Sequence, residues 1–418
     1  MNRVGIEALN VFGGTAVVDV HELAERRGLA SSRAAGLLMD EKAVALPFED
    51  AVTLAACAAR PVLDALTRAE VESIRLLITC TESGIDFSKS TASYLHDVLG
   101  LSSQCRVFEV KQACYSGTAG LQMAAAFVLS QAAPGTRALV VATDLSRYAP
   151  VADAAGAAED WSYAEPSGGA GAVALLVGRD PRVFDLDIGA SGLHAAEVMD
   201  TCRPAPDTEF GDVDLSLLSY LDCCENAYRD YARSVADVRY DSTFDHLAFH
   251  TPFGGMVKGA HRSMMRKFAQ ASPEFTAADF ERRVEPGLAW CRRVGNIMGG
   301  TVFLSLASTI ANADITTTRR VGCFSYGSGC ASEFYSGVVS PESVSTLAAM
   351  SISEHLDSRL RLDVADYDDL VDRAEFVRFG TRTARVDHPL LAEVVQASTV
   401  PRLVLRGITD HHREYEWT

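Results

Sequence analysis

Short apolar runs alternate with amphipathic stretches along nearly all of the 418-residue chain. This alternation is typical of an α/β fold, in which helices cover strands that are themselves buried. Buried strands are predicted at 74–80, 138–143, 170–177, 246–250, 321–326 and 403–408. Helices are predicted at 51–65, 117–130, 256–271 and 300–313, and loops at 153–169, 203–211 and over much of 340–385.

The chain is long enough, and at 48% hydrophobic residues apolar enough, to bury a large core. We therefore expect two or three domains, or one large duplicated fold. A faint repeat favours duplication: one strand is followed by Glu82, Gly84 and a helix, and another by His250, Gly254-Gly255 and a helix. True duplication would bring Glu82 and His250, at the carboxyl ends of their strands, to one shared pocket. A single parallel of this kind also arises by chance.

Charge and cysteine pattern exclude several classes of protein. A net charge of −17 is unsuited to nucleic acid, whose phosphates need a basic surface. Ten cysteines are dispersed without a C-x-x-C pair, and the chain shows no secretory signal and no apolar run of about 20 residues. We therefore expect a cytoplasmic protein with reduced thiols and no membrane span. His246 and His250 make a poor metal pair because they lie on a predicted strand, so no metal is expected.

The segment 108–120 is predicted to be a strand that ends in a turn and leads directly into a helix. Cys114 lies in that turn, where the helix dipole and free backbone N–H groups favour a thiolate. This context makes Cys114 a candidate nucleophile. The alternative is an ordinary buried cysteine, which is what most cysteines are.

Two further candidates follow predicted strands. Glu82 lies just after an apolar run and could act as a general base if an apolar pocket raises its pKa. The alternative is a helix-capping or solvated glutamate. His250 could donate to an acyl oxygen or assist proton transfer, and the alternative is a histidine satisfied within the core.

Two glycine-containing stretches could supply polar groups to an acyl site. Gly295-Asn296 precedes a predicted helix, and Tyr326-Gly-Ser-Gly329 follows a predicted strand. Glycine leaves the backbone free enough to aim an N–H at an oxyanion. Either stretch could equally be an ordinary turn.

Four motifs occur in an order that resembles the hydroxymethylglutaryl-CoA synthase family. They are Glu-Ser-Gly-Ile-Asp (82–86), Gln-Ala-Cys-Tyr-Ser-Gly-Thr-Ala-Gly (112–120), Phe-His-Thr-Pro-Phe (249–253) and Tyr-Gly-Ser-Gly (326–329). The resemblance covers nearly the whole chain, including the segment 218–230 and the C-terminal strand before residues 410–413. It implies the thiolase fold, a duplicated five-layer αβαβα arrangement that is normally a homodimer. The expected halves are residues 1–180, with the nucleophile, and 181–418, with the histidine and a family-specific insertion.

The resemblance also implies roles for individual residues. Cys114 takes the acetyl group, Glu82 removes a proton from its methyl, and His250 orients and polarises the acceptor ketone. The backbone N–H groups of Cys114 and Ser328 form the acetyl oxyanion hole. Further residues match family positions that line the pocket: Asn296, Asp144 and Tyr148. No cofactor is implied beyond the phosphopantetheine arm that carries each substrate.

Within the family, the exact residues of the motifs favour the synthases of polyketide β-branching. Isoprenoid-pathway enzymes generally carry Cys-Tyr-Gly-Gly where this chain has Cys114-Tyr-Ser-Gly117. The β-branching enzymes use acyl carrier proteins, one to deliver acetyl and another to present the β-ketoacyl chain. The alternative is a CoA-dependent synthase of isoprenoid biosynthesis, and the sequence does not distinguish an acetyl from a propionyl donor.

Carrier proteins are acidic, so an acidic enzyme that binds them needs local positive charge at the pocket mouth. Lys258, Arg262 and Arg266 are spaced to lie along one face of the predicted helix, with Lys267 beside them. Arg33 is a further candidate. The alternative is a solvated basic face without a partner.

Two other functions remain open at this point. A decarboxylating ketosynthase could use Cys114, His250 and Asn296, but it would have no need of a base at Glu82. A catalytically silent homologue could bind carrier proteins without reacting, although retention of all three candidate catalytic residues speaks against it.

Overall fold

The computed structural model describes residues 3–146, 164–205, 208–372, 376–398 and 400–418. Nine strands form its largest sheet: β1 (Gly5–Phe12), β4 (Ile74–Cys80), β5 (Arg106–Val110), β6 (Arg137–Leu145), β7 (Ala170–Gly178), β8 (Phe184–Ala195), β11 (His246–Phe249), β12 (Arg319–Gly327) and β13 (Ala331–Val339). Their order is β11-β12-β13-β8-β1-β7-β6-β4-β5.

The sheet contains the same pairing pattern twice. From β1 outward, β7 and β6 pair antiparallel and β4 joins parallel. From β8 outward, β13 and β12 pair antiparallel and β11 joins parallel. The two patterns meet at a short seam between β1 and β8, where Gly5 faces Asp185 and Ile6 faces Phe184. Glu82 follows β4 and His250 follows β11, so the faint repeat in the sequence corresponds to equivalent strands of a duplicated fold.

Helices cover both faces of this sheet. They are α1 (Val20–Arg26), α2 (Ser31–Leu37), α3 (Ala51–Asp64), α4 (Arg68–Glu72), α5 (Thr91–Val98), α6 (Ser116–Ser130), α8 (Val213–Ser234), α9 (Gly254–Met264), α10 (Pro273–Arg283), α11 (Glu285–Val294), α12 (Thr301–Asn312), α13 (Pro341–Ala348), α14 (Ile352–Asp357), α15 (Val364–Asp372) and α16 (Leu390–Ala397). A π-helical turn, Met265–Ala269, continues α9. A 3-10 turn, Met298–Gly300, leads into α12.

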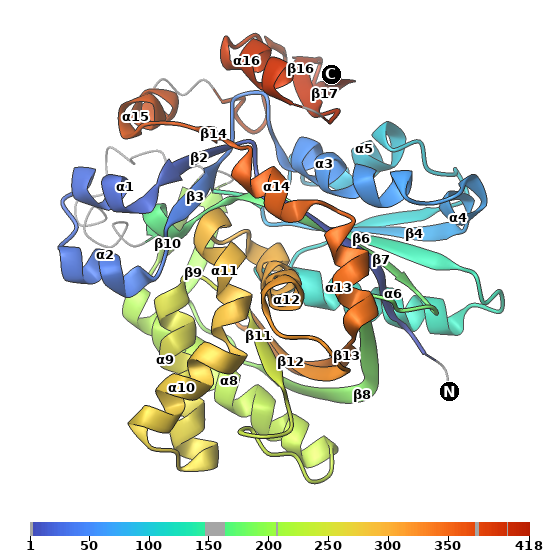
Figure 1. Ribbon diagram of the computed structural model, residues 1–418. Helices are drawn as coiled ribbons and strands as arrows, with labels where there is room; N and C mark the ends of the chain where they lie inside the picture. The colour runs from blue at the N-terminus through green and yellow to red at the C-terminus, as the bar shows by residue number, and fades with distance from the viewer. Residues whose placement is uncertain (1–2, 147–163, 206–207, 373–375, 399) are drawn as a thin grey trace.

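The central helices are buried on almost every side, as expected for a layer enclosed by sheets. In α12 every residue from Thr301 to Ile310 is buried, and Figure 1 places this helix at the middle of the molecule. Helix α6 packs against β4, β6 and β7, while α3 packs against β1, β6 and β7. Helix α8 covers β8 and β13. These contacts agree with the layered arrangement that the resemblance implies.

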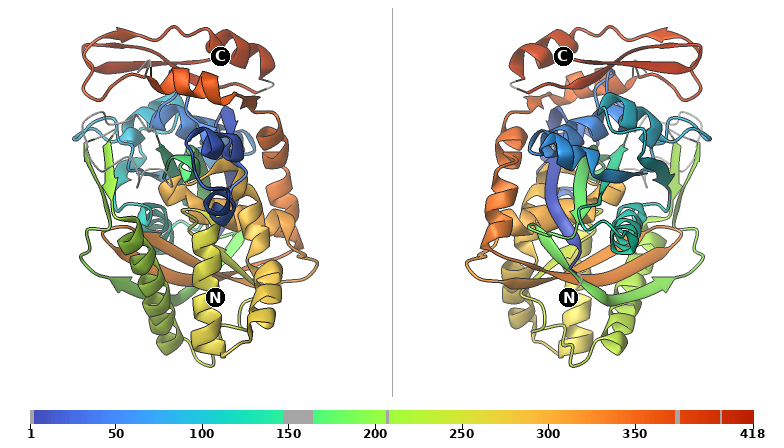
Figure 2. Two further views of the ribbon diagram at one scale, coloured as in Figure 1. Left: turned by 90° about the vertical axis from the view of Figure 1, so that its left-hand side faces the viewer. Right: turned by 90° about the vertical axis from the view of Figure 1, so that its right-hand side faces the viewer.

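Three smaller sheets complete the fold. Their strands are β2 (Ala16–Asp19), β3 (Glu41–Val44), β9 (Thr201–Ala205), β10 (Thr208–Gly211), β14 (Leu360–Arg361), β15 (Ala384–Arg385), β16 (Leu403–Thr409) and β17 (His412–Trp417). The C-terminal sheet β15-β16-β17 forms a separate layer at one end of the molecule (Figure 2). Asp50, which caps α3 by accepting from Val52 N and Thr53 N, also accepts from Arg413 and Tyr415 of this layer.

All six predicted strands and all four predicted helices are present, whereas two predicted loops are wrong. Residues 203–211 belong mostly to the β9–β10 hairpin, and the region 340–385 contains α13, α14 and α15. These elements are short and mostly polar, so periodicity gives little signal. A start signal was nevertheless present, because Ser340 forms a capping box with Ser343 and Pro341 occupies the first helical turn. Most of the predicted loop 153–169 lies outside the described residues.

Within the described part of the chain, no helix is both long enough and apolar enough to span a membrane.

Candidate active site

Cys114 occupies a tight turn between β5 and α6. The preceding residue, Ala113, has a left-handed backbone with φ of +44°. Two glycines allow the chain to close around this turn. A Cβ at Gly327 would lie 2.6 Å from Tyr115 N, and one at Gly117 would lie 2.1 Å from Gly299 O. The glycine motifs of the sequence are therefore explained by close backbone approach around the cysteine.

The thiol of Cys114 is buried and lies against a carboxylate. Its Sγ is 3.4 Å from Glu82 Oε1. Burial raises the pKa of Cys114 well above its usual value, and the negative charges of Glu82 and Asp144 raise it further. Burial and the neighbouring carboxyl groups therefore oppose the thiolate that the helix dipole favours. The helix α6 begins only at Ser116, and burial beside carboxyl groups outweighs its dipole.

Asp144 holds the turn that carries Glu82. Its Oδ1 accepts hydrogen bonds from Glu82 N at 2.8 Å, from Ser83 N at 3.0 Å and from the hydroxyls of Thr81 and Ser83. Burial raises the pKa of Asp144, and the charge of Glu82 adds to that effect. Asp144 thus fixes the backbone on which Glu82 stands, from a position behind the cleft.

His250 directly follows β11 and is fully buried. Its backbone N–H donates to Phe324 O at 2.7 Å, and its carbonyl accepts from the hydroxyl of Tyr220 on α8 at 2.6 Å. Burial lowers the pKa of His250 to about 3. The imidazole is therefore neutral near pH 7, with one ring N–H to donate.

The two glycine-containing stretches are held by polar partners. Asn296 Oδ1 accepts from Met298 N at 3.0 Å and from the Thr301 hydroxyl at 2.9 Å. Buried Asp200 accepts from the Tyr326 hydroxyl and, at 2.9 Å, from Gly329 N. Asp200 therefore ties together the two ends of the segment that contains Ser328.

A cleft of about 1240 Å³ brings most of the predicted residues together. Its lining includes Glu82, Cys114, His250, Asn296 and Ser328. Tyr148 lies outside the described residues. No group of three or more potential metal-ligating side chains occurs within the described ranges.

Sequence reasoning missed Arg203, which also lines the cleft. This residue comes from β9, in the segment predicted as a loop. Its Nε lies 3.8 Å from Glu82 Oε2, and its Nη1 donates to Glu82 O at 3.4 Å and to the Ser83 hydroxyl at 3.3 Å. A single arginine in a polar segment carries no signal in the sequence, because its partners lie about 120 residues away.

The predicted basic residues lie on the surface, but not along one uniform helix. Lys258 and Arg262 are exposed on α9, whereas Arg266 is exposed on the π-helical turn. The wider turn changes the spacing expected for a continuous α-helix. Lys267, beside them, forms an ion pair with Glu225 of α8.

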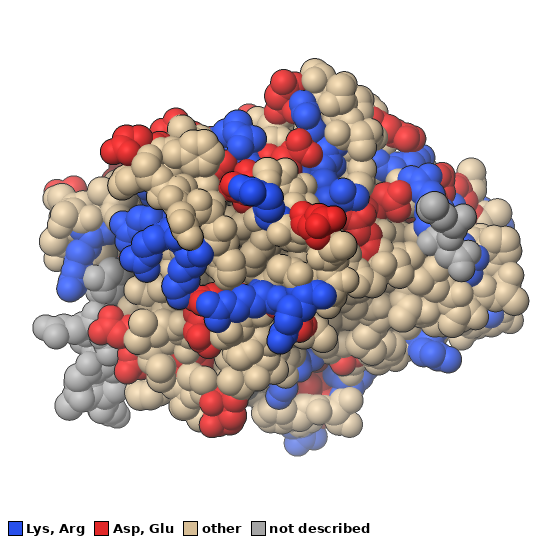
Figure 3. Space-filling model, turned by 90° about the horizontal axis from the view of Figure 1, so that it is seen from below, with Lys and Arg blue, Asp and Glu red and all other residues tan. Residues whose placement is uncertain are grey.

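Arg33 is exposed on α2, which packs against the start of α9. A Cβ at Gly255 would lie 2.0 Å from Gly36 O, so glycine permits this close contact. Figure 3 shows basic side chains gathered in a band on the face seen from below, toward which the lower ends of α8, α9 and α10 point in Figure 1.

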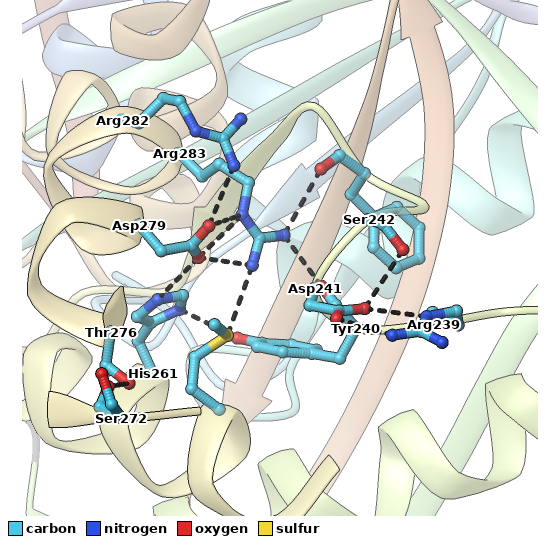
Figure 4. Close-up of polar contacts among 12 residues, drawn as sticks. Arg239, Tyr240, Asp241, Ser242, His261, Ser272, Thr276, Asp279, Arg282 and Arg283 are labelled. Carbon is cyan, nitrogen blue, oxygen red and sulfur yellow. Dashed lines mark hydrogen bonds and ion pairs between the residues drawn. The ribbon is translucent and has the colours of Figure 1, made fainter. Parts of the chain in front are cut away.

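A buried polar cluster anchors α9 to α10 (Figure 4). Asp279 accepts a forked pair of hydrogen bonds from Arg283 and lies 3.2 Å from His261 Nε2. His261 Nδ1 is 3.2 Å from the hydroxyl of Tyr240, and Arg283 also donates to the Tyr240 carbonyl. Although burial opposes it, hydrogen bonds from His261 and Arg283 hold the pKa of Asp279 low. The cluster joins the basic helix to the loop that precedes β11 and His250.

Comparison with known proteins agrees with this geometry. The hydroxymethylglutaryl-coenzyme A synthase N-terminal family matches residues 1–182, and the corresponding C-terminal family matches residues 260–382. The chain is 55% identical to the polyketide biosynthesis 3-hydroxy-3-methylglutaryl-ACP synthase PksG of Bacillus subtilis (strain 168), over 100% of both chains. It is 33% identical to the hydroxymethylglutaryl-CoA synthase of Enterococcus faecalis, over 87% of this chain and 90% of the other.

The solved structures give the same result. The HMG synthase of the curacin biosynthetic pathway, in complex with acetyl donor-ACP, is 55% identical with a TM-score of 0.95, and the match covers 100% of both chains. The resemblance seen in the motifs is thereby confirmed, as is the duplicated thiolase fold. The chain belongs to the hydroxymethylglutaryl-CoA synthase family, and it is an acyltransferase that forms a carbon–carbon bond.

Proposed function

We propose that this enzyme adds the methyl carbon of an acetyl group, held on Cys114, to the β-ketone of an acyl chain on a carrier protein, in polyketide β-branching. The observation that carries the proposal is the 3.4 Å contact between Cys114 Sγ and Glu82 Oε1, in a cleft that also holds neutral His250. Nucleophile, base and hydrogen-bond donor thus surround one space.

The first step loads the acetyl group. Because the pKa of Cys114 is raised, its thiol must lose a proton as it attacks the donor thioester, and Glu82 is in position to take it. Glu82 then returns the proton to the departing phosphopantetheine thiol. The N–H groups of Cys114 and Ser328 are proposed to bind the acetyl oxygen.

The second step forms the carbon–carbon bond. Ionised Glu82 removes a methyl proton from acetyl-Cys114, and the resulting carbanion attacks the ketone carbon of the acceptor. Neutral His250 donates to the ketone oxygen and protonates the alkoxide that forms, and the proton that Glu82 took from the methyl returns by way of water to the imidazole. Hydrolysis then frees the product from Cys114. Asn296, Asp144 and Tyr148 are proposed as supporting pocket residues.

The similarity pattern supports a carrier-protein donor over free CoA. Identity is 55% to the enzyme named as an ACP synthase and 33% to the enzyme named as a CoA synthase. We assign donor docking to the exposed residues Arg33, Lys258, Arg262 and Arg266. The acceptor is proposed to arrive on a second carrier protein, and no cofactor beyond the phosphopantetheine arms is required.

Three finer assignments accompany this proposal. The boundary between the halves, near residue 180, falls between the end of β7 and the start of β8. We propose a homodimer and a cytoplasmic location, and the ten cysteines are free thiols in the structure.

Matched donors test the function. The purified enzyme is incubated with acetyl-CoA, acetyl-carrier, propionyl-carrier or malonyl-carrier protein, and intact mass reports acylation. The proposal expects acetylation from the carrier to be the fastest. Faster loading from acetyl-CoA would favour the CoA-dependent alternative, and decarboxylating turnover of the malonyl donor would favour a ketosynthase. A chain that gains no acyl group from any donor would be catalytically silent.

A further inference from the structure

The last step of the proposed reaction creates a negative charge inside the cleft, beside buried Cys114. Water adds to the thioester carbon on Cys114, the C–S bond breaks, and its electron pair leaves on Sγ. One proton of the water goes to Sγ and the other passes to Glu82 and then to solvent. The released acyl group therefore ends in a carboxylate, formed beside the carboxyl groups of Glu82 and Asp144.

Such a product needs a cation close to Cys114. Arg203 lines the same cleft, and its guanidinium contacts the Glu82 side chain, the Glu82 carbonyl and the Ser83 hydroxyl. Burial raises the pKa of Cys114 and of Asp144, and the positive charge of Arg203 partly opposes this rise in both groups. Lys89, another basic residue of the lining, instead has its ammonium 3.6 Å from the centre of the Tyr94 ring.

The contacts of Arg203 with Glu82 and Ser83 are long. They measure 3.8, 3.4 and 3.3 Å, whereas Arg292 forms a fork with Asp40 at 2.9 and 2.8 Å. Charge-assisted hydrogen bonds usually shorten to about 2.7–2.9 Å. Arg203 therefore forms no fork with the Glu82 carboxylate as tight as that between Arg292 and Asp40.

We infer that Arg203 binds the carboxylate that is released from Cys114, and that it stabilises this charge as it develops during hydrolysis. The inference rests on the proposed roles of Cys114 and Glu82. It adds a substrate-contacting residue from β9 and explains why a basic side chain faces the catalytic carboxylate. Arginine suits the task because its planar fork matches a carboxylate and it remains charged.

The test uses the full-length enzyme with Arg203→Met and Arg203→Lys. After addition of acetyl donor and β-ketoacyl carrier protein, the condensed intermediate links the enzyme to the carrier through Cys114. Denaturing gels and intact mass measure this adduct. We expect Arg203→Met to acetylate at Cys114 and to accumulate the adduct, with release slowed by roughly 10–100-fold, within the range for loss of one charge-stabilising donor. Arg203→Lys should recover part of the rate.

Inhibition by free acetate provides a second readout. Acetate should slow acetylation of the wild-type enzyme by occupying the carboxylate position, and Arg203→Met should weaken this inhibition by about tenfold or more. The matched control is Arg320→Met on β12, which removes an ion pair with Asp187 of β8. It should change neither readout.

The outcomes distinguish failure of this inference from failure of the proposed function. Wild-type release rate and unchanged acetate inhibition in Arg203→Met would overturn the inference while leaving the proposed function intact. Lack of acetylation at Cys114 in the wild-type enzyme would instead overturn the proposed function. Equal slowing of acetylation, condensation and release in Arg203→Met would indicate a damaged pocket and would also count against the inference.

Discussion

The thiol of Cys114 donates to the carboxylate of Glu82 across 3.4 Å, so the proposed nucleophile and base are in contact before any substrate arrives. Glu82 is therefore placed to accept two protons in turn, the first from the Cys114 thiol and the second from the methyl of the acetyl group. The two proton transfers can be studied separately, because loading leaves an acetyl group on Cys114 whereas condensation leaves the larger condensed adduct there.

Replacement of Cys114 by alanine should abolish acetylation, because the reactive thiol is the one beside Glu82. Intact mass and peptide mapping measure the label. Cys105→Ala is the control, since burial raises the pKa of Cys105 to about 11 and no role is assigned to it. Label that persists in Cys114→Ala, or that maps to Cys105 or Cys323, would contradict the assignment.

Replacement of Glu82 by alanine should leave Cys114 able to load acetyl while condensation falls by about 10²–10⁴-fold, as expected for a lost general base. Loading slows because Glu82 no longer takes the thiol proton. It persists because loss of the Glu82 charge leaves burial as the main cause that raises the pKa of Cys114, which eases ionisation of the thiol. Single-turnover mass spectrometry follows both steps. Near-normal condensation would leave Glu82 as a structural residue.

Charge reversal at Arg266 should slow acetyl transfer from a carrier protein more than transfer from CoA. The loss should shrink as salt screens the wild-type attraction. Arg382→Glu is the control, because Arg382 pairs with Asp410 near the C-terminal layer. Acetyl transfer rates from the carrier protein and from CoA are measured across a salt series, and the effect of the variant on the first is divided by its effect on the second. Equal losses with both donors would point to a damaged pocket.

Burial of neutral His250 should make stability sensitive to acid. Its folded pKa of about 3 lies below the usual value of 6.5, so protons bind the unfolded state first as pH falls. The stability gained above pH 6.5 is therefore lost progressively between pH 6.5 and 3. The loss should reach about 2 kcal/mol at pH 5. Denaturant unfolding of wild type and His250→Gln at pH 7 and 5 measures it, and an identical pH dependence in both would refute the assignment.

Substitution of Asp279 by asparagine should destabilise the fold by about 3–5 kcal/mol, because the buried charge of Arg283 would lose its partner. The control is Asp241→Asn, which removes an exposed ion pair with Arg239 and should cost about 0–1 kcal/mol. Urea unfolding compares the two variants. Similar small effects would mean that the cluster in Figure 4 contributes little to stability.

The sequence predicted those features that depend on neighbours along the chain. The strand at 74–80 is observed with the same bounds, and Cys114 lies in the expected strand-turn-helix segment. Glu82, Cys114 and His250 meet in one cleft because each follows a strand that could be recognised. Their catalytic roles stay predictions.

Features set by distant contacts could not be predicted. The dipole of α6 is local and favours a thiolate, but the pKa of Cys114 is raised by burial and by carboxyl groups on other segments. Arg203 lies in a short polar strand whose partner, Glu82, is far away in the sequence. Periodicity alone predicts a continuous helix through Arg266, whereas the structure has a π-helical turn there, whose Met265 is buried in the core.

The two equivalent parts of the largest sheet are joined at the short seam between β1 and β8. Only Gly5 with Asp185 and Ile6 with Phe184 pair across it, and a Cβ at Gly5 would lie 2.1 Å from Phe184 O. In the proposed reaction, the carbanion is made by one half of the molecule, and the ketone is polarised by the other. A change at this seam, remote from the cleft, would therefore alter the alignment of the two reacting carbons.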